Sequence, residues 1–319
     1  MHNFMKIDLS DFDNRRESII HDLMKAASED GFFYVINHGI ALNDIRTMFD
    51  ASYSFFEMPD DKKKNYSMDL PRNAGWEKLS QIRPSTGVAD LKESIQLSFH
   101  NAADLRPSEE ELPGFDTTAS HFMEQCNEVS QKLLTCFAAG LGFPQDFFTR
   151  CHDISQPDTL NSLRCMRYFD TTHNTDSSPC RVSEHTDIHT FSLLFQRPNQ
   201  NGLEVLHDNV WTPINLDEGE IVCNIGDMIA RWSDDRFQSK LHRVRKPNAN
   251  EYQGPRYALE YVNEANRSVI IQGRTKYTEP ITAGEFLMMA MERNHKAIKA
   301  LEAKPSNIAL IAYNIYRTS

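Results

Sequence analysis

No apolar stretch in the 319-residue sequence approaches the roughly 18 residues that a membrane span requires. The N-terminus, MHNFMKIDLSDFD, also lacks the charged start and apolar run of a secretory signal. Basic residues are in deficit, because 34 Lys and Arg stand against 45 Asp and Glu, for a formal net charge of -11. Binding to nucleic acid or anionic membranes requires basic surface. We therefore expect a soluble, cytoplasmic protein that binds neither nucleic acid nor membrane.

The six cysteines show none of the C-x-x-C pairs that mark many metal and redox sites. They are scattered along the chain, at Cys126, Cys136, Cys151, Cys165, Cys180 and Cys223. This scatter is typical of free thiols in a reducing compartment, which agrees with a cytoplasmic location.

The first 150 residues mix helical and strand patterns. Apolar residues recur at helical spacing over 15–29, 42–57 and 117–141, and β-forming residues predict strands at 6–9 and within GFFYVINHGI. Residues 58–92 are polar and are interrupted by prolines, which predicts a long loop of the kind that often covers a site. We interpret the run DDKKK in this loop as a solvated helical turn.

From Leu163 to about Ile271 the sequence changes to short β-type runs separated by turn residues. Many short strands at close spacing favour a sandwich or a barrel. A last helix is expected over 283–302. The chain should therefore be mainly β, with helices packed outside the β-rich part.

A His-x-Asp pair, His185 and Asp187, is the first sign of chemistry. Residues at i and i+2 project to the same side of an extended strand, so both side chains can reach one metal ion. His242 opens a later β-run, and a sandwich can bring such distant strand ends together. Two imidazoles and one carboxylate can occupy one face of an octahedral Fe(II) and leave positions open for oxygen and an organic ligand. His189 follows closely, but on a strand or loop it need not share that face, so we leave it out.

Arg256 begins the run RYALEYV, whose alternation puts Arg256, Ala258, Glu260 and Val262 on one face. The other face is apolar and should pack against the rest of the protein. Arg256 then points either into the mouth of a barrel, where it can hold the far carboxylate of a two-acid cosubstrate, or into solvent from an edge strand.

Taken in order, these segments resemble the 2-oxoglutarate-dependent, non-haem Fe(II) dioxygenases of the isopenicillin N synthase-like group. The resemblance covers nearly the whole chain. It is carried by MKIDLS, EDGFFYVINHGI, FFEMPDDKK, DLKES, SLRCMRYF, EHTD, NIGDMIARWSDDRFQSKLHRV and GPRYALEYV.

The resemblance implies a double-stranded β-helix (a distorted, cupin-like jelly roll) with flanking helices. It implies one domain over 1–319, with a mixed α/β part at 1–150, the jelly-roll core at 151–275, and a C-terminal helix and tail at 276–319. The iron ligands would be His185, Asp187 and His242. Arg256 would pair with the distal carboxylate of 2-oxoglutarate, and Tyr168 would hydrogen-bond the same cosubstrate. With O2, the reaction would release succinate and carbon dioxide and activate a C–H bond by hydroxylation, desaturation or cyclisation.

The chain departs from the family pattern at two positions. The usual Arg-x-Ser on the late strand has Ala258 as its third residue, and Phe169 stands where proline is typical. The alanine removes one hydroxyl donor to the cosubstrate, and a hydrogen bond to a charged group contributes about 1.5–3 kcal/mol.

The small-molecule substrate is indicated only by alternation and by position in the chain. The candidate contact residues are Arg164, Met166, Ile188, Glu260, Val262 and Trp76. We hypothesise a small zwitterionic, amino-acid-like metabolite of a biosynthetic pathway, with Arg164 binding its carboxylate and Glu260 its amine. Alternatively Arg164 and Glu260 pair with each other or with other side chains, or the substrate is a planar nucleobase. Residues 72–82, which include Trp76, and the C-terminal helix should form the cover, where Trp76 either contacts substrate or has a buried packing role.

Other functions remain open at this point. An Fe(II) oxidase of the same fold could use Arg256 for a substrate carboxylate without 2-oxoglutarate. A ligand-binding protein could retain the fold without catalysis. A zinc hydrolase could also use two histidines and a carboxylate, although no general base is evident. We expect a monomer or a weak homo-oligomer.

Overall fold

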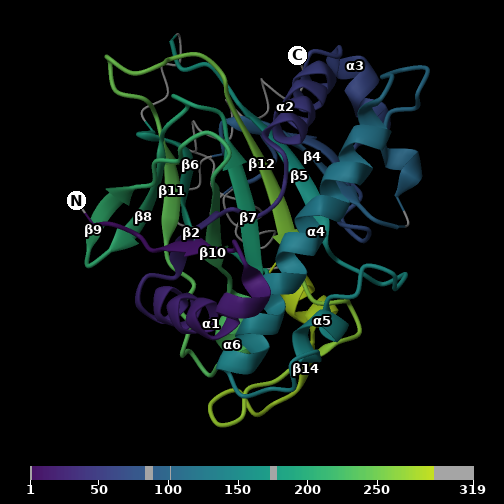
Figure 1. Cartoon of the computed structure of the whole chain (residues 1–319). Helices are drawn as coiled ribbons and strands as arrows, with labels where there is room; N and C mark the ends of the chain where they lie inside the picture. The colour runs from purple at the N-terminus through teal and green to yellow at the C-terminus, as the bar shows by residue number, and fades with distance from the viewer. Residues whose placement is uncertain (1, 83–88, 101, 173–177, 291–319) are drawn as a thin grey trace, which may run out of the picture.

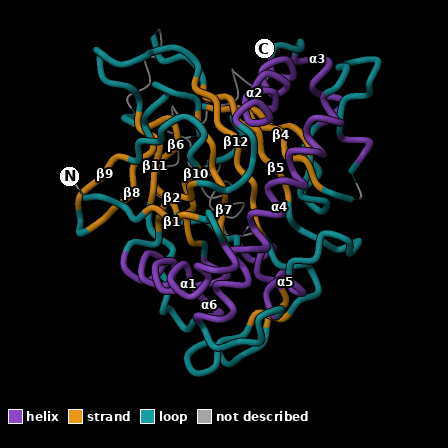
Figure 2. Tube along the Cα trace, in the orientation of Figure 1, coloured by secondary structure: helices purple, strands orange, loops and turns teal. Residues whose placement is uncertain are grey.

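The computed structural model describes residues 2–82, 89–100, 102–172 and 178–290. A large and a small β-sheet pack together at the centre, and helices lie against the large sheet (Figures 1 and 2). This mainly β architecture with flanking helices confirms the expected fold class. The strands of the first 150 residues join the same large sheet as the later strands.

The large sheet has eight strands in the order β1-β2-β10-β7-β12-β5-β4-β3, and the small sheet has the order β6-β11-β8-β9. The strands of the large sheet are β1 (Lys6–Asp8), β2 (Phe32–Ile36), β3 (Gly75–Lys78), β4 (Lys92–Ser98), β5 (Ser162–Tyr168), β7 (Phe191–Gln196), β10 (Ile221–Ile225) and β12 (Arg256–Asn263). Those of the small sheet are β6 (Cys180–His185), β8 (Leu203–His207), β9 (Val210–Pro213) and β11 (His242–Arg245). A separate pair is formed by β13 (Ile270–Ile271) and β14 (Ile281–Thr282).

The α-helices are α1 (Phe12–Glu29), α2 (Leu42–Phe56), α3 (Asp60–Lys63), α4 (Phe115–Gly140), α5 (Phe147–Cys151) and α6 (Asp227–Trp232), with 3-10 turns η1 (Lys64–Tyr66) and η2 (Ala103–Leu105). Residues 283–290 are also helical, whereas the rest of the helix expected to reach 302 lies outside the described residues. None of the helices in the described ranges is long and apolar enough to cross a membrane.

The two faces of the large sheet have different partners. The outer face carries Cys165, Leu193 and Leu259, which belong to one apolar core with the buried sides of α1, α2 and α4. The inner face carries Met166 and Ala258, which pack in a second cluster with the small sheet. Strand alternation therefore sends the even-numbered residues of β5 and β12 between the sheets.

The DDKKK run is only partly solvated, which corrects the sequence interpretation. Lys63 is buried, and its Nζ lies 2.8 Å from Glu93 Oε2 and donates to the Phe56 carbonyl. Arg167 also pairs with Glu93. A buried carboxylate requires such cationic and hydrogen-bonding partners, so Lys63 faces inward while Asp61, Lys62 and Lys64 stay exposed.

Candidate active site

Three residues that lie far apart in the sequence meet at one end of the small sheet. His185 ends β6, His242 begins β11, and the two are paired opposite each other. Oδ1 of Asp187 lies 3.6 Å from His185 Nε2, and its Oδ2 lies 3.2 Å from His242 Nε2. The two imidazoles are tilted by 52°. The structure therefore brings together the three expected ligands, with ligand atoms all within 4.8 Å of one another.

A β-bulge aims His185 at this point. His185 pairs with His242, but Val182 pairs with Val244, so β6 has one extra residue over this stretch. Val182 packs in the cluster between the sheets, and unbroken alternation from it would turn His185 to the opposite face. The extra residue at the bulge shifts the alternation by one position and returns His185 to the face that Val182 occupies, as bulges beside active sites often do.

Backbone carbonyls set the tautomer of both imidazoles. His185 Nδ1 lies 2.9 Å from the Ser183 carbonyl and His242 Nδ1 lies 3.1 Å from the Lys240 carbonyl. Because a carbonyl oxygen can only accept, each Nδ1 carries a proton, which leaves Nε2 as the ring atom that would bind a metal. This is the arrangement that metal-binding histidines use.

The Asp187 carboxylate is held in its ionised form. Burial alone would raise the pKa of this carboxyl, but the imidazoles of His242 and His189 outweigh burial and hold the pKa well below its usual range. Asn224 Nδ2 donates to Asp187 Oδ2 at 2.6 Å and fixes its orientation. Two imidazoles, each with a ring nitrogen free to bind a metal, and one oriented carboxylate are a suitable donor set for Fe(II).

Arg256 lies on the inner face and is almost completely buried, so the solvent-facing alternative for this residue is wrong. Its Nε donates to the Gln200 carbonyl at 2.9 Å and its Nη2 to Gln196 Oε1 at 3.1 Å. Nη1 has no hydrogen-bond partner in the described structure, and no described carboxylate lies within 4 Å of the guanidinium. A buried cation without a counter-charge fits an anionic ligand.

Tyr168 is the cross-strand partner of Arg256, and the guanidinium carbon lies 4.7 Å from the centre of the phenol ring. The Tyr168 hydroxyl donates to the weak acceptor Met166 Sδ, at 3.4 Å. Arg181, a second buried guanidinium, has a pKa lowered to about 10 by burial and by the charge of Arg256. These groups form a positive, donor-rich region suited to a carboxylate of a dicarboxylic acid.

Arg164 and Glu260 are direct cross-strand partners on β5 and β12, yet they do not form an ion pair. Nε and Nη2 of Arg164 both donate to Gln96 Oε1, at 3.0 and 2.5 Å. Glu260 turns the other way, and its Oε1 lies 3.9 Å from His189 Nε2. The two side chains therefore do not pair with each other, but the alternative that they contact other side chains holds, since Arg164 binds Gln96 and Glu260 lies near His189.

Met166 and Val262 share the inner face with Arg164 and Glu260, because all four occupy even positions of β5 and β12. Both are buried. Of the six candidate substrate residues, these four are therefore arranged on one surface, and the other two are not.

Trp76 lies on β3 opposite Ile95, on the outer face of the large sheet. Its Nε1 donates to Glu93 Oε2 at 2.8 Å, and its ring packs in the outer core. Of the two roles considered for Trp76, the structure therefore supports the buried packing role rather than substrate contact. Ile188 is half-buried and packs against the same outer core, so it does not join the inner surface either.

Sequence reasoning missed His189. Its Nε2 lies 3.2 Å from Asp187 Oδ2, the ring is buried, and neither ring nitrogen has a hydrogen-bond partner in the described structure. It shares this region with Glu260 and with Glu264, whose Oε2 is also buried without a partner. His189 lies outside strand geometry, so strand alternation gave no signal for its approach to Asp187.

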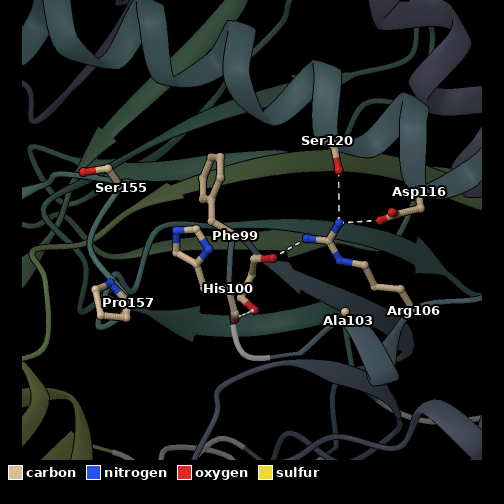
Figure 3. Close-up of a pocket in the computed structure, with 9 residues that line it drawn as sticks. Phe99, His100, Ala103, Arg106, Asp116, Ser120, Ser155 and Pro157 are labelled. Atoms are coloured by element: carbon tan, nitrogen blue, oxygen red, sulfur yellow. Dashed lines mark hydrogen bonds and ion pairs between the residues drawn. The ribbon is translucent and has the colours of Figure 1, made fainter.

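A surface cavity of about 630 Å³ lies beside α4, as Figure 3 shows. Its lining includes Phe99, Arg106 and Asp116 but none of the three candidate ligands. The guanidinium of Arg106 is already bonded to Asp116, to Ser120 Oγ and to a main-chain carbonyl. This cavity therefore offers no unsatisfied charge and is not the candidate active site.

The comparisons with known proteins agree with this geometry. Residues 6–116 match the family described as "non-haem dioxygenase in morphine synthesis N-terminal", and residues 160–263 match the "2OG-Fe(II) oxygenase superfamily". Proline hydroxylase buaE of Petromyces alliaceus is 30% identical over 312 residues, covering 88% of this chain and 96% of that protein. Validamycin A dioxygenase of Streptomyces hygroscopicus subsp. limoneus is 28% identical and covers 80% of this chain and 73% of that protein.

Among solved structures, a full-length Neurospora crassa protein in complex with alpha-KG and thymine superposes with a TM-score of 0.80 at 25% identity. The match covers 92% of this chain and 98% of that one. These similarities extend over both the N-terminal part and the β-rich core. The chain therefore belongs to the 2-oxoglutarate-dependent Fe(II) oxygenases, enzymes that use Fe(II), 2-oxoglutarate and O2.

Proposed function

We propose that His185, Asp187 and His242 hold Fe(II) and that Arg256 and Tyr168 hold 2-oxoglutarate in a single-domain oxygenase of small-metabolite biosynthesis. The convergence of the three ligand atoms, with Nδ1 of both imidazoles bound to backbone carbonyls and Nε2 left for a metal, is the observation that carries this assignment. When bound, iron and 2-oxoglutarate supply an oxidising centre that reacts with O2, releases succinate and carbon dioxide, and attacks a C–H bond.

The protein's own residues orient and shield this chemistry. Asn224 holds Asp187 in place through its 2.6 Å hydrogen bond. Arg256 provides a fixed cation for the distal carboxylate, because two of its nitrogens are anchored to Gln200 and Gln196. Burial between the two sheets excludes water, which strengthens these electrostatic contacts.

The substrate we propose is a small zwitterionic, amino-acid-like molecule. Arg164 and Glu260 are cross-strand neighbours whose charged groups do not neutralise each other. A ligand that carries both a negative and a positive group could therefore contact both side chains. Glu264 lies near this acceptor side, and burial raises the pKa of its carboxyl to about 7. The carboxylate of the substrate would bind Arg164, and its amine would bind Glu260. A relative named as a proline hydroxylase supports this class of substrate.

A nucleobase is the second candidate, because the N. crassa structure contains thymine. The amide of Gln96 and the carboxyl of Glu260 could hydrogen-bond the edge of a pyrimidine, but Val262 and Met166 offer no aromatic ring for stacking. An iron oxidase that does without 2-oxoglutarate would leave the Arg256 guanidinium to a substrate carboxylate. The six free cysteines agree with the reducing cytoplasm that we propose as its location.

Two measurements test the proposal. Anaerobic titration of the Fe(II) protein with 2-oxoglutarate should produce a metal-to-ligand charge-transfer band, and succinate release should depend on added 2-oxoglutarate. A panel of L-amino acids and pyrimidines should then show coupled turnover with an amino acid. Arg164→Ala and Glu260→Gln should each raise the KM of that substrate, whereas the exposed control Arg150→Ala should not. Unchanged KM values in both site variants would contradict the zwitterion assignment.

A further inference from the structure

Gln196 stands out among the buried residues around Arg256. It ends β7 and is the cross-strand partner of Ala258 on β12, on the inner face. Its Oε1 accepts a hydrogen bond from Arg256 Nη2 at 3.1 Å. A guanidinium can only donate, so the carbonyl oxygen of the amide must face it. This contact fixes the orientation of the amide, so that Nε2 is the part of the Gln196 side chain that does not contact Arg256.

Nε2 of Gln196 is buried and has no hydrogen-bond partner in the described structure, and the same holds for Nη1 of Arg256. A buried donor without an acceptor costs about 1–3 kcal/mol, so native proteins seldom leave one without a reason. Here two such donors belong to side chains that are bonded to each other. One carboxylate, with two acceptor oxygens, could satisfy both.

Ala258, which lies next to both donors, supplies no acceptor or donor from its side chain. Ala258 is completely buried and ends in a methyl group, so it can make no hydrogen bond from its side chain. Its partner across the ladder, Gln196, is the nearest residue with a spare donor at that level of the sheet.

We propose that Gln196 Nε2, acting beside Arg256, donates the hydrogen bond to the distal carboxylate of 2-oxoglutarate that Ala258 cannot supply. Gln196 then has two roles, because it positions the guanidinium through Oε1 and binds the cosubstrate through Nε2. This inference rests on the assignment of Arg256 to the distal carboxylate.

The test measures 2-oxoglutarate affinity without turnover, by calorimetry on the Mn²⁺-loaded full-length protein. Gln196→Met keeps the length of the side chain and removes its donor, and we expect the Kd to rise about ten-fold or more. Gln196→Glu keeps an acceptor for Arg256 but places a carboxylate beside the ligand, so its Kd should rise further. Adding Ala258→Ser to Gln196→Met should restore most of the affinity, because a hydroxyl returns to the neighbouring position.

The controls separate this inference from the assignment on which it rests. Gln125→Met removes the amide of a half-buried glutamine on α4 that donates to Asp44, away from the proposed site, and its 2-oxoglutarate Kd should match that of the parent protein. Arg256→Met should weaken binding strongly. If it does so while both Gln196 variants bind like the parent, the role of Gln196 is wrong and that of Arg256 stands. If Arg256→Met also binds normally, the carboxylate site itself is misplaced. If Ala258→Ser fails to restore binding in the Gln196→Met protein, the proposal that Gln196 replaces a hydroxyl donor at position 258 is also wrong.

Discussion

Arg164 and Glu260 face each other across β5 and β12, yet Arg164 donates both of its hydrogen bonds to Gln96 while Glu260 turns toward His189. Opposite charges directly across an antiparallel pair would ordinarily attract each other. Their separation leaves an anion-binding and a cation-binding group at adjacent places on one surface. This relationship is the main structural support for a substrate with charges of both signs.

A double-mutant cycle on these two residues gives the first prediction. Because Arg164 and Glu260 are not paired, the stability changes of Arg164→Ala and Glu260→Gln should add to within about 0.5 kcal/mol in the double variant. The cycle is measured by urea unfolding of the metal-free protein. A coupling energy well above that value would mean that the two side chains interact in solution, and the substrate argument would then lose its basis.

Removing the Asn224 amide should weaken the metal site without removing a ligand. Asn224→Ala deletes the hydrogen bond to Asp187 Oδ2, and such supporting contacts typically contribute roughly 10–100-fold in metal affinity. Fe(II) affinity is measured anaerobically by competition with a chelator. His242→Ala, which removes a proposed ligand, should show a larger loss and serves as the reference. An Asn224→Ala protein with parental affinity would show that Asp187 needs no such support.

Trp76→Phe should affect stability and leave substrate kinetics unchanged. The substitution leaves Glu93 Oε2 without its indole donor, in a site that is completely buried. We expect a loss of about 1–3 kcal/mol in the free energy of unfolding, measured by chemical denaturation. The KM of the best substrate should stay within error of the parent value. A selective change in KM with unchanged stability would return Trp76 to the substrate site.

Glu264 should make stability depend on pH in a specific direction. Its pKa is raised to about 7 by burial, above its ordinary value, so the folded protein binds this proton more tightly than the unfolded chain does. The stabilising effect is fully present below the unfolded pKa of 4.5 and is lost as pH rises through about 7. Its size is on the order of 3 kcal/mol.

The matching variant is Glu264→Gln, which keeps the shape and removes the charge. It should be more stable than the parent at about pH 8 and nearly equal to it at about pH 5, because only the ionised form is disfavoured. Thermal unfolding of the metal-free proteins at a series of pH values measures this difference. Parallel curves for the two proteins would show that Glu264 keeps an ordinary pKa.

Period-two alternation was enough to place the inner surface of β12 and β5. It grouped Arg256, Glu260 and Val262 correctly, because both strands are long and one face of each packs against helices. Alternation gave no guide to Trp76, for which substrate contact and buried packing both stayed open. Prolines on either side made residues 58–92 look like a loop, whereas β3 pairs with β4 and sends the indole to the outer core.

His189 was missed for a different physical reason. Residues 186–190 leave the strand geometry after β6, so neither strand nor helix periodicity applies to them. The approach of His189 to Asp187 depends on how the chain turns toward β7, and hydrogen bonds from Gly226 to Thr190 and from Asp227 to Asp187 fix that turn. Such long-range contacts leave no local pattern in a single sequence.

The sequence by itself indicated the type of chemistry, because two histidines, one aspartate and one arginine in this order carried the resemblance to the 2-oxoglutarate-dependent Fe(II) oxygenases, the family to which the chain belongs. Tertiary structure alone decided the rest. A single extra residue in β6 turns His185 to face His242, and pairing choices across β4, β5, β12 and β7 send Arg164, Glu260 and Gln196 toward different partners. Local patterns state which face a side chain occupies, whereas only packing between distant strands determines which neighbour it contacts.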